Sequence, residues 1–191
     1  MLKISIDPKA TVIGSLPQGG QGIEIGVHEG DLSERLIRFT KPKRLYLIDP
    51  WAVFDDDTHA DSWYGSRKVT EKDMDARHQR VVKRVGWLNN VTILRDFSQN
   101  VADRFDDETM DFVYIDGDHS YEAVKRDIAL YGPKVKPGGV LIGDDFRPGE
   151  WWGMGVIRAF TETLADHKSW RLLLKLGDQI IIRKTGYKRR N

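Results

Sequence analysis

The stretch DFVYIDGDHSY, from Asp111 to Tyr121, decides the fold of this 191-residue chain. It is a short run of β-branched and aromatic residues that stops at carboxylates, and a second such run, GGVLIGDDF, extends from Gly138 to Phe146. Runs of this kind are typical of buried parallel strands. In an open α/β sheet, ligands bind beyond the carboxyl ends of the strands. Two neighbouring strands would therefore deliver these residues to one crevice: Asp116, Asp118, His119, Asp144 and Asp145.

So many acids exceed what the end of a packed sheet requires. Hard divalent cations prefer carboxylate oxygens, so the pattern predicts a cation site beside a cofactor pocket. The alternative for Asp144 and Asp145 is a turn at the end of a strand, with both carboxylates facing solvent.

Composition excludes several classes of protein. Hydrophobic residues make up 40% and charged residues 31%, as in a globular domain. No apolar run approaches the ~18 residues of a membrane span, and the N-terminal segment has no signal-peptide core. The chain has no cysteine, which excludes disulfides, zinc-thiolate sites and thiol catalysis. We therefore expect a cytoplasmic protein.

The charge is balanced, with a formal net value of +1. The only dense basic cluster lies between Lys184 and Arg190. Nucleic-acid binding usually requires a broad basic face. We therefore expect the cluster to be a solvated tail, and we expect no nucleic-acid partner.

Strand-like and helix-like segments alternate along the chain. The expected strands are 22–26, 44–48, 91–94, 111–115 and 139–143, and the expected helices are 31–39, 69–85, 99–105, 121–131 and 155–167. Two further strands, 170–175 and 179–183, are close enough to form a hairpin. This order predicts one domain over residues 1–191, a doubly wound α/β sheet that is mostly parallel with one antiparallel strand. Residues 50–66 form a long loop, typical of a lid or a disordered segment.

A glycine-containing turn follows the first expected strand, from Glu24 to Gly30. Gly26 and Gly30 would let the backbone turn tightly and approach a ligand. The spacing does not match the dinucleotide fingerprint, and Glu29 stands where a pyrophosphate would meet the helix. A cofactor with a cationic amino group and a sulfonium fits this acidic turn better. A plain strand-to-helix turn is the alternative.

Two further positions extend the predicted cofactor pocket. Asp49 ends the second strand, where a carboxylate can accept hydrogen bonds from both ribose hydroxyls; capping of the next turn is the alternative. Ser98 and Gln99 follow the third strand and could bind an adenine edge. Their alternative role is to cap and begin a helix.

The series EIGVHEG, LYLIDPW, VTILRDFSQ, FVYIDGDHSYEAVKRDI and KPGGVLIGDDF resembles class I S-adenosylmethionine-dependent O-methyltransferases over residues 20–146. The likeness is greatest to the metal-dependent group that includes macrocin-type sugar methyltransferases, and is more distant to catechol and caffeoyl-CoA enzymes. The resemblance implies a Rossmann-like fold, with Asp49 on the ribose and the turn from Glu24 to Gly30 around the methionine part. It also implies a divalent cation, most simply Mg²⁺, between Asp116, Asp144 and Asp145.

A vicinal diol could chelate such a cation, which would lower the pKa of the hydroxyl nucleophile. His119 lies where the catechol-type enzymes carry a lysine base, and a histidine can take a proton near neutral pH. Asp116 is a rival base, and His119 could instead cap the next helix or donate to a carboxylate. Loop aromatics could form the walls of the acceptor site, and for each of them the alternative is packing of a loop onto the sheet: Trp51, Trp63, Tyr64, Trp151 and Trp152.

The sequence thus predicts a metal-assisted O-methyltransferase acting on a hydroxyl of a small molecule such as a sugar, a catechol or a natural product. An NAD-dependent oxidoreductase and a non-catalytic cofactor-binding protein of the same fold are the alternatives. We expect no membrane partner, and a second copy of the chain could complete the pocket as a homodimer.

Overall fold

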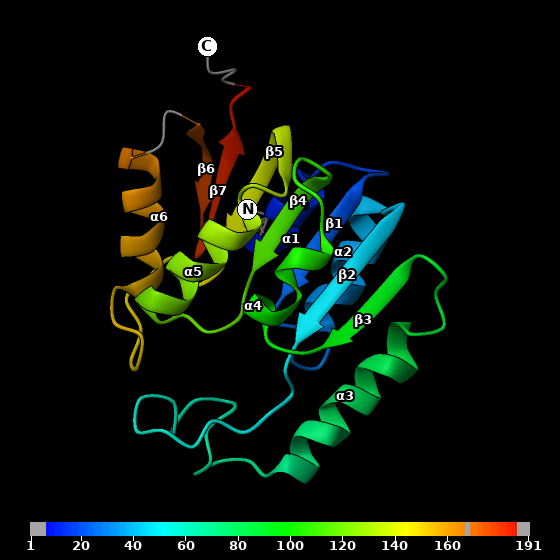
Figure 1. Cartoon of the computed structure of the whole chain (residues 1–191), viewed down its shortest axis with the longest axis vertical. Coiled ribbons are helices and arrows are strands. Elements are labelled where there is room, and N and C mark those ends of the chain that lie inside the picture. The colour runs from blue at the N-terminus through cyan, green and yellow to red at the C-terminus, as the bar shows by residue number, and fades with distance from the viewer. Residues whose placement is uncertain (1–6, 167–168, 187–191) are drawn as a thin grey trace, which may run out of the picture.

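A single seven-stranded sheet forms the centre of the computed structural model, which describes residues 7–166 and 169–186 (Figure 1). The strand order is β3-β2-β1-β4-β5-β7-β6. The strands are β1 (Gln21–Ile25), β2 (Arg44–Asp49), β3 (Val91–Arg95), β4 (Met110–Ile115), β5 (Val135–Gly143), β6 (Trp170–Leu176) and β7 (Gln179–Lys184). β1 to β5 pair in parallel and β7 is antiparallel to both of its neighbours, which confirms the predicted sheet. Residues 187–190 of the basic cluster lie outside the described residues.

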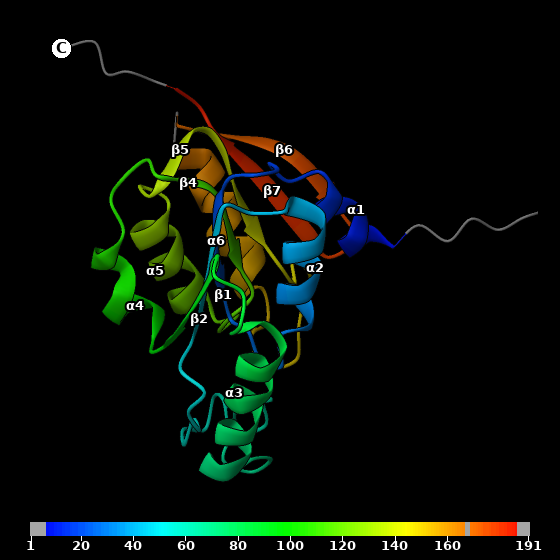
Figure 2. The ribbon, with the colours of Figure 1, turned by 90° about the vertical axis from the view of Figure 1, so that its right-hand side faces the viewer.

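Helices cover both faces of the sheet, as Figure 2 shows. They are α1 (Pro8–Gly14), α2 (Asp31–Thr40), α3 (Glu71–Val85), α4 (Ser98–Val101) with the 3₁₀ turn η1 (Ala102–Arg104), α5 (Tyr121–Tyr131) and α6 (Gly155–Asp166). One hydrophobic core lies under α1, α2 and α3, and the other under α4, α5 and α6. The doubly wound architecture is therefore confirmed. No helix in the described part of the chain has the length and apolar content needed to cross a membrane.

Helix α1 was not predicted from the sequence. Its start carries a recognisable signal, because Asp7 is the N-cap, accepting a hydrogen bond from the Ala10 amide at 3.1 Å, and Pro8 follows in the first turn. Val12 and Ile13 are both fully buried, so α1 belongs to the core.

A second difference concerns β5, which begins four residues earlier than expected. Lys136, Pro137 and Gly138 precede the expected strand but lie inside the observed one, where the β4–β5 register shifts between Met110 and Phe112. Pro137 has no amide hydrogen to give to a ladder, and proline in sheets is confined to such irregular positions.

The register of the sheet aligns the strand ends. Ile25 of β1 pairs with Ile48 of β2 and with Ile115 of β4, and Ile115 pairs in turn with Gly143 of β5. Backbone hydrogen bonds extend these ladders by one residue, to Gly26, Asp116 and Asp144. The residues that end or follow these strands therefore form a row along one edge: Gly26, Asp49, Asp116 and Asp144.

Candidate functional site

The turn after β1 holds the two glycines at positive φ, +87° at Gly26 and +84° at Gly30. A Cβ atom on Gly26 would lie 2.1 Å from the carbonyl oxygen of Asp116. The close approach that requires this glycine is therefore to the chain's own backbone at the end of β4. Gly30 is the N-cap of α2.

Glu29 lies on the same turn, and its carboxylate pairs with Arg80 of α3 at 2.7 Å. Its charge is therefore balanced, so it opposes a pyrophosphate less strongly than the sequence suggested.

Asp49 is buried at the end of β2 and accepts four hydrogen bonds. Its Oδ2 atom accepts from the amides of Val27 at 2.8 Å and His28 at 3.0 Å, and from the Tyr64 hydroxyl at 2.6 Å. Its Oδ1 atom accepts from the Trp51 amide at 2.7 Å. Burial raises the pKa of Asp49, although these hydrogen bonds favour its charged form. Every donor is uncharged, so a ribose hydroxyl could exchange with the Tyr64 hydroxyl.

Glu24 lies inside the sheet edge and is fully buried. Its Oε2 atom accepts a hydrogen bond from the Ser33 hydroxyl at 2.7 Å, whereas its Oε1 atom has no hydrogen-bond partner among the described residues. Burial raises the pKa of Glu24 well above its ordinary value. A buried, unsatisfied carboxyl oxygen is costly, and a cationic ligand group would satisfy it.

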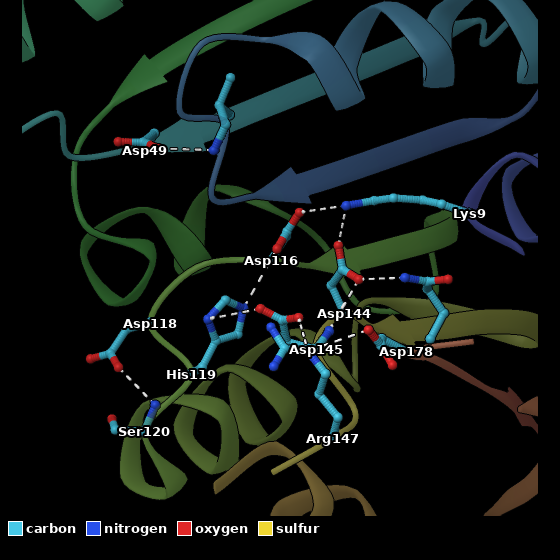
Figure 3. A network of polar contacts seen from close by, with 12 residues as sticks. Lys9, Asp49, Asp116, Asp118, His119, Ser120, Asp144, Asp145, Arg147 and Asp178 are labelled. Atoms are coloured by element: carbon cyan, nitrogen blue, oxygen red, sulfur yellow. Dashed lines mark hydrogen bonds and ion pairs between the residues drawn. The ribbon is translucent and has the colours of Figure 1, made fainter. Parts of the chain in front are cut away.

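Lys9 of α1 reaches the ends of β4 and β5 (Figure 3). Its ammonium lies 3.4 Å from Oδ2 of Asp116 and forms a closer ion pair with Oδ2 of Asp144. Burial opposes the charge of Lys9, but the two carboxylates outweigh it and raise the pKa of the lysine. Burial also raises the pKa of Asp144, yet Lys9 and Gln179 outweigh that effect and hold it below its ordinary value.

The predicted metal site does not fit this arrangement. Lys9 stands between Asp116 and Asp144, and Asp145 turns to Arg147, with 3.1 Å between Oδ1 and Nε. Within residues 7–166 and 169–186, no three His, Asp or Glu side chains are grouped to hold a metal ion. The structure therefore does not support the prediction of Mg²⁺ at Asp116, Asp144 and Asp145. The physical reason is that Lys9, on the unpredicted helix α1, places its ammonium between the two acids where the metal ion was expected.

His119 is mostly buried next to these acids. Its Nε2 atom lies 3.5 Å from Oδ1 of Asp116, and its Nδ1 atom lies 3.9 Å from Oδ2 of Asp145. Burial disfavours the charged imidazole, but the surrounding carboxylates outweigh it and raise the pKa of His119. Burial raises the pKa of Asp116 to about 6, although His119 and Lys9 favour its charged form. Helix α5 is capped by Ser120 and not by His119.

The long loop after β2 is folded over this edge. His59 of the loop contacts Asp56 through Nδ1 at 2.8 Å, and Asp118, which follows β4, through Nε2 at 3.2 Å. Its ring packs edge-on against Trp151 at 5.2 Å between ring centroids. The Tyr64 hydroxyl of the same loop binds Asp49, so the loop contacts the β2 end and the β4 end of the predicted crevice.

The tryptophans divide into two groups. Trp51 is fully buried and donates from Nε1 to the His28 carbonyl at 2.9 Å. For Trp51 the structure therefore supports the alternative, packing onto the sheet, over a place in the wall of the acceptor site. Trp63 is 68% exposed and stacks on His28. Trp151 and Trp152 pack against each other, and Trp152 lies 5.3 Å from the His119 ring.

Ser98 and Gln99 begin α4, which covers the same face of the sheet as α5 and α6. The Ser98 hydroxyl donates to the buried carboxylate of Asp127 at 2.6 Å, so it is engaged between α4 and α5. Burial raises the pKa of Asp127 to about 6, and the Ser98 hydrogen bond opposes that rise. Gln99 is exposed, and its contact with an adenine stays a prediction.

Backbone strain gathers at the same edge. Three non-glycine residues with positive φ lie two or three residues beyond a strand end: His28 after β1, Trp51 after β2 and Asp145 after β5, at +53°, +40° and +49°. Such conformations cost about 1–3 kcal/mol each and cluster at functional sites. The crevice therefore combines strained backbone, buried acids and a histidine.

Comparison with known families identifies the class to which this arrangement belongs. The family described as "Methyltransferase domain" matches residues 23–146, more than half of the chain. The chain belongs to that family. This membership confirms the prediction of an S-adenosylmethionine-dependent methyltransferase and sets aside the oxidoreductase alternative.

Solved structures share the fold at low sequence identity. The O-methyltransferase TomG from Streptomyces achromogenes, solved with SAM, has a TM-score of 0.64 and 16% identity, covering 96% of this chain and 82% of its own. A putative rRNA-methylase from Clostridium thermocellum has a TM-score of 0.63 and 15% identity, covering 95% of this chain and 100% of its own. A methyltransferase from Geobacter sulfurreducens has a TM-score of 0.59 and 13% identity, covering 95% and 80%. The Rossmann-like fold is thereby confirmed.

One curated relative is an uncharacterised protein of Acanthamoeba polyphaga mimivirus. It is 25% identical over 144 residues, which are 75% of this chain and 59% of the relative. The chain thus spans less than two thirds of that relative's length.

Proposed function

We propose that this methyltransferase acts on a hydroxyl oxygen of a small molecule, with His119 as the base and no divalent cation. The observation that carries the proposal is the position of His119, beside Asp116 at the strand edge and next to Trp152. No step is assigned to a metal ion, because the acids that would hold it are paired with Lys9.

The described residues fit the cofactor. Asp49 offers a carboxylate to the ribose, and Glu24, on the strand before the glycine turn, has an unsatisfied oxygen that a cationic amino group would satisfy. Gly26 and Gly30 shape that turn, and Gln99 is the candidate contact for the adenine. When bound, S-adenosylmethionine supplies an electrophilic methyl group on its sulfonium.

The histidine tautomer follows from the distances around its ring. Nε2 is the nitrogen nearer to a carboxylate, at 3.5 Å from Oδ1 of Asp116; this contact is not a hydrogen bond, but the carboxylate charge favours the proton on that atom. Nδ1 is 3.9 Å from Asp145, beyond hydrogen-bond distance, and is free to accept a proton from the acceptor hydroxyl. Such general-base catalysis contributes about 10²–10⁴-fold to a rate. Trp151 and Trp152 offer an aromatic wall for the acceptor.

A methyl-transfer assay with labelled S-adenosylmethionine tests this function. The panel contains sugars, catechols, polyhydroxylated natural products, amines and ribosomal RNA, each with and without EDTA. We expect transfer to a hydroxylated small molecule, unchanged by EDTA and strongly reduced in His119→Gln. Transfer to RNA or amines alone, or transfer abolished by EDTA and restored by Mg²⁺, would contradict the proposal.

A further inference from the structure

The apolar residues of α1 determine which way the Lys9 side chain points. Val12 and Ile13 lie three and four positions after Lys9, so these three residues share one face of the helix. Both apolar residues are buried in the core. The stem of Lys9 therefore follows the buried face towards the sheet, and its ammonium reaches the acids.

Helix α1 is held in place at its first turn. Asp7 pairs with Arg35 of α2, with 3.2 Å between Oδ2 and Nη2. Pro8 packs on the turn between β6 and β7, where a Cβ atom on Gly177 would lie 2.7 Å from the Cβ of Pro8. Lys9 thus comes from an anchored helix, fixed against two other elements.

Both carboxylate oxygens of Asp144 already have partners. Its Oδ1 atom accepts from Gln179 Nε2 at 2.6 Å and from the Asp145 amide at 3.0 Å, and its Oδ2 atom pairs with Lys9. Asp116 shares the same ammonium through Oδ2 and contacts His119 through Oδ1. A cation could bind here only by displacing Lys9.

We propose that Lys9 is a built-in cation, which excludes divalent ions from the crevice and fixes Asp116 beside His119. This inference rests on the proposed function for the role of His119, whereas the exclusion of ions does not. Lys9 is a positioning residue, because it acts on the base through Asp116. One fixed positive charge offsets part of the charge of two carboxylates that would otherwise repel each other.

Manganese binding, followed by electron paramagnetic resonance, tests the exclusion directly. We expect wild-type protein to bind no Mn²⁺ in the crevice, and Lys9→Met to bind one ion, because methionine keeps the stem and removes the charge. Adding Asp144→Asn to Lys9→Met should abolish the gained site. Lys9→Arg, which keeps a cation, should exclude Mn²⁺ as the wild type does.

Lys136→Met is the matched control. Lys136 pairs with Asp111 at 2.9 Å, and its side chain is 39% exposed against 32% for Lys9, but it faces one carboxylate in place of two. Removing it should create no Mn²⁺ site.

Wild-type protein that binds Mn²⁺ through Asp144, as shown by loss of the signal in Asp144→Asn, would overturn the inference. This comparison of wild type with Asp144→Asn still tests the inference if Lys9→Met does not fold. A folded Lys9→Met protein that binds no Mn²⁺ would overturn it as well. Calorimetry with S-adenosylhomocysteine on the same samples reports on the proposed function separately, because failure of cofactor binding leaves the manganese result unaffected.

Discussion

Asp49 and Asp144 occupy equivalent places at the edge of one sheet but have different partners. Each follows or ends a buried strand, and their exposed fractions are 1% and 4%. Asp49 accepts only from uncharged donors, and its pKa is raised by burial. Asp144 pairs with an ammonium, and its pKa is lowered in spite of burial.

The difference separates the crevice into two halves. Neutral donors can be exchanged for those of a ligand at little electrostatic cost, so Asp49 suits a binding role. A carboxylate paired with a lysine is costly to separate once buried, so Asp144 suits a fixed framework around Asp116 and His119. Under the proposed function, aspartates at two strand ends of one sheet would serve cofactor binding in one half and hold the base in the other.

The largest expected effect lies in the chemical half. His119→Ala should lower turnover by about 10²–10⁴-fold while the affinity for S-adenosylhomocysteine stays nearly unchanged. Steady-state kinetics and calorimetry on one preparation separate the two quantities. A nearly normal rate in His119→Ala would mean that Asp116 is the base, and it would contradict the proposed roles of the two halves.

The pH dependence of turnover tests which group is the base. The proposed base is the neutral imidazole. Burial lowers the pKa of His119, but Asp116, Asp145 and Asp144 outweigh burial and raise it. Turnover should therefore fall as the pH falls through an apparent pKa above the ordinary histidine value of about 6.5. Asp116→Asn removes the carboxylate nearest Nε2 and should shift this limb to lower pH in whatever activity remains. A limb that does not move would show that another group is titrating.

A smaller effect is expected in the binding half. Asp49→Ala removes the acceptor for the ribose and should weaken S-adenosylhomocysteine binding by about 1–3 kcal/mol. Calorimetric titration measures the change. Asp111→Ala, at the opposite end of the sheet, is the control and should leave the affinity unchanged. Equal affinities in all three proteins would remove Asp49 from the cofactor site.

The smallest effect concerns the exchangeable donor itself. Tyr64→Phe leaves Asp49 with three of its four hydrogen bonds, so the free energy of unfolding without cofactor should fall by about 0.5–1.5 kcal/mol. Cofactor affinity should be equal or slightly higher, because the hydroxyl no longer competes with the ribose. Urea unfolding and calorimetry measure these quantities. A clear loss of affinity would mean that Tyr64 holds the cofactor instead of yielding to it.

The strand edge could be predicted because local sequence specifies it. β-branched runs that end in acids place Asp49, Asp116 and Asp144 after strands, and a parallel sheet then gathers them at one edge. The sequence likewise predicted a tight turn at Gly26 and Gly30, and both residues have positive φ.

The partners of those acids could not be predicted in the same way. Lys9 lies 107 residues from Asp116 and 135 from Asp144, on a helix of seven residues. The Asp7-Pro8 pair marked the start of that helix, but nothing local indicated which acids it would meet. The orientation of Asp145 follows from a backbone φ of +49°, which sequence pattern does not specify for aspartate. The burial of Trp51 depended on how a loop folds back.

The long separation between Lys9 and its partners also affects how the protein is made. Chains emerge from the ribosome at about 5–20 residues per second, so Lys9 is synthesised many seconds before Asp144. Gln179, which also binds Asp144, follows another 35 residues later. Lys9 is already present when Asp144 is synthesised, but the Gln179 amide is not, so Asp144 passes through a period without that hydrogen bond. Co-translational maturation of this enzyme must wait for the last hairpin.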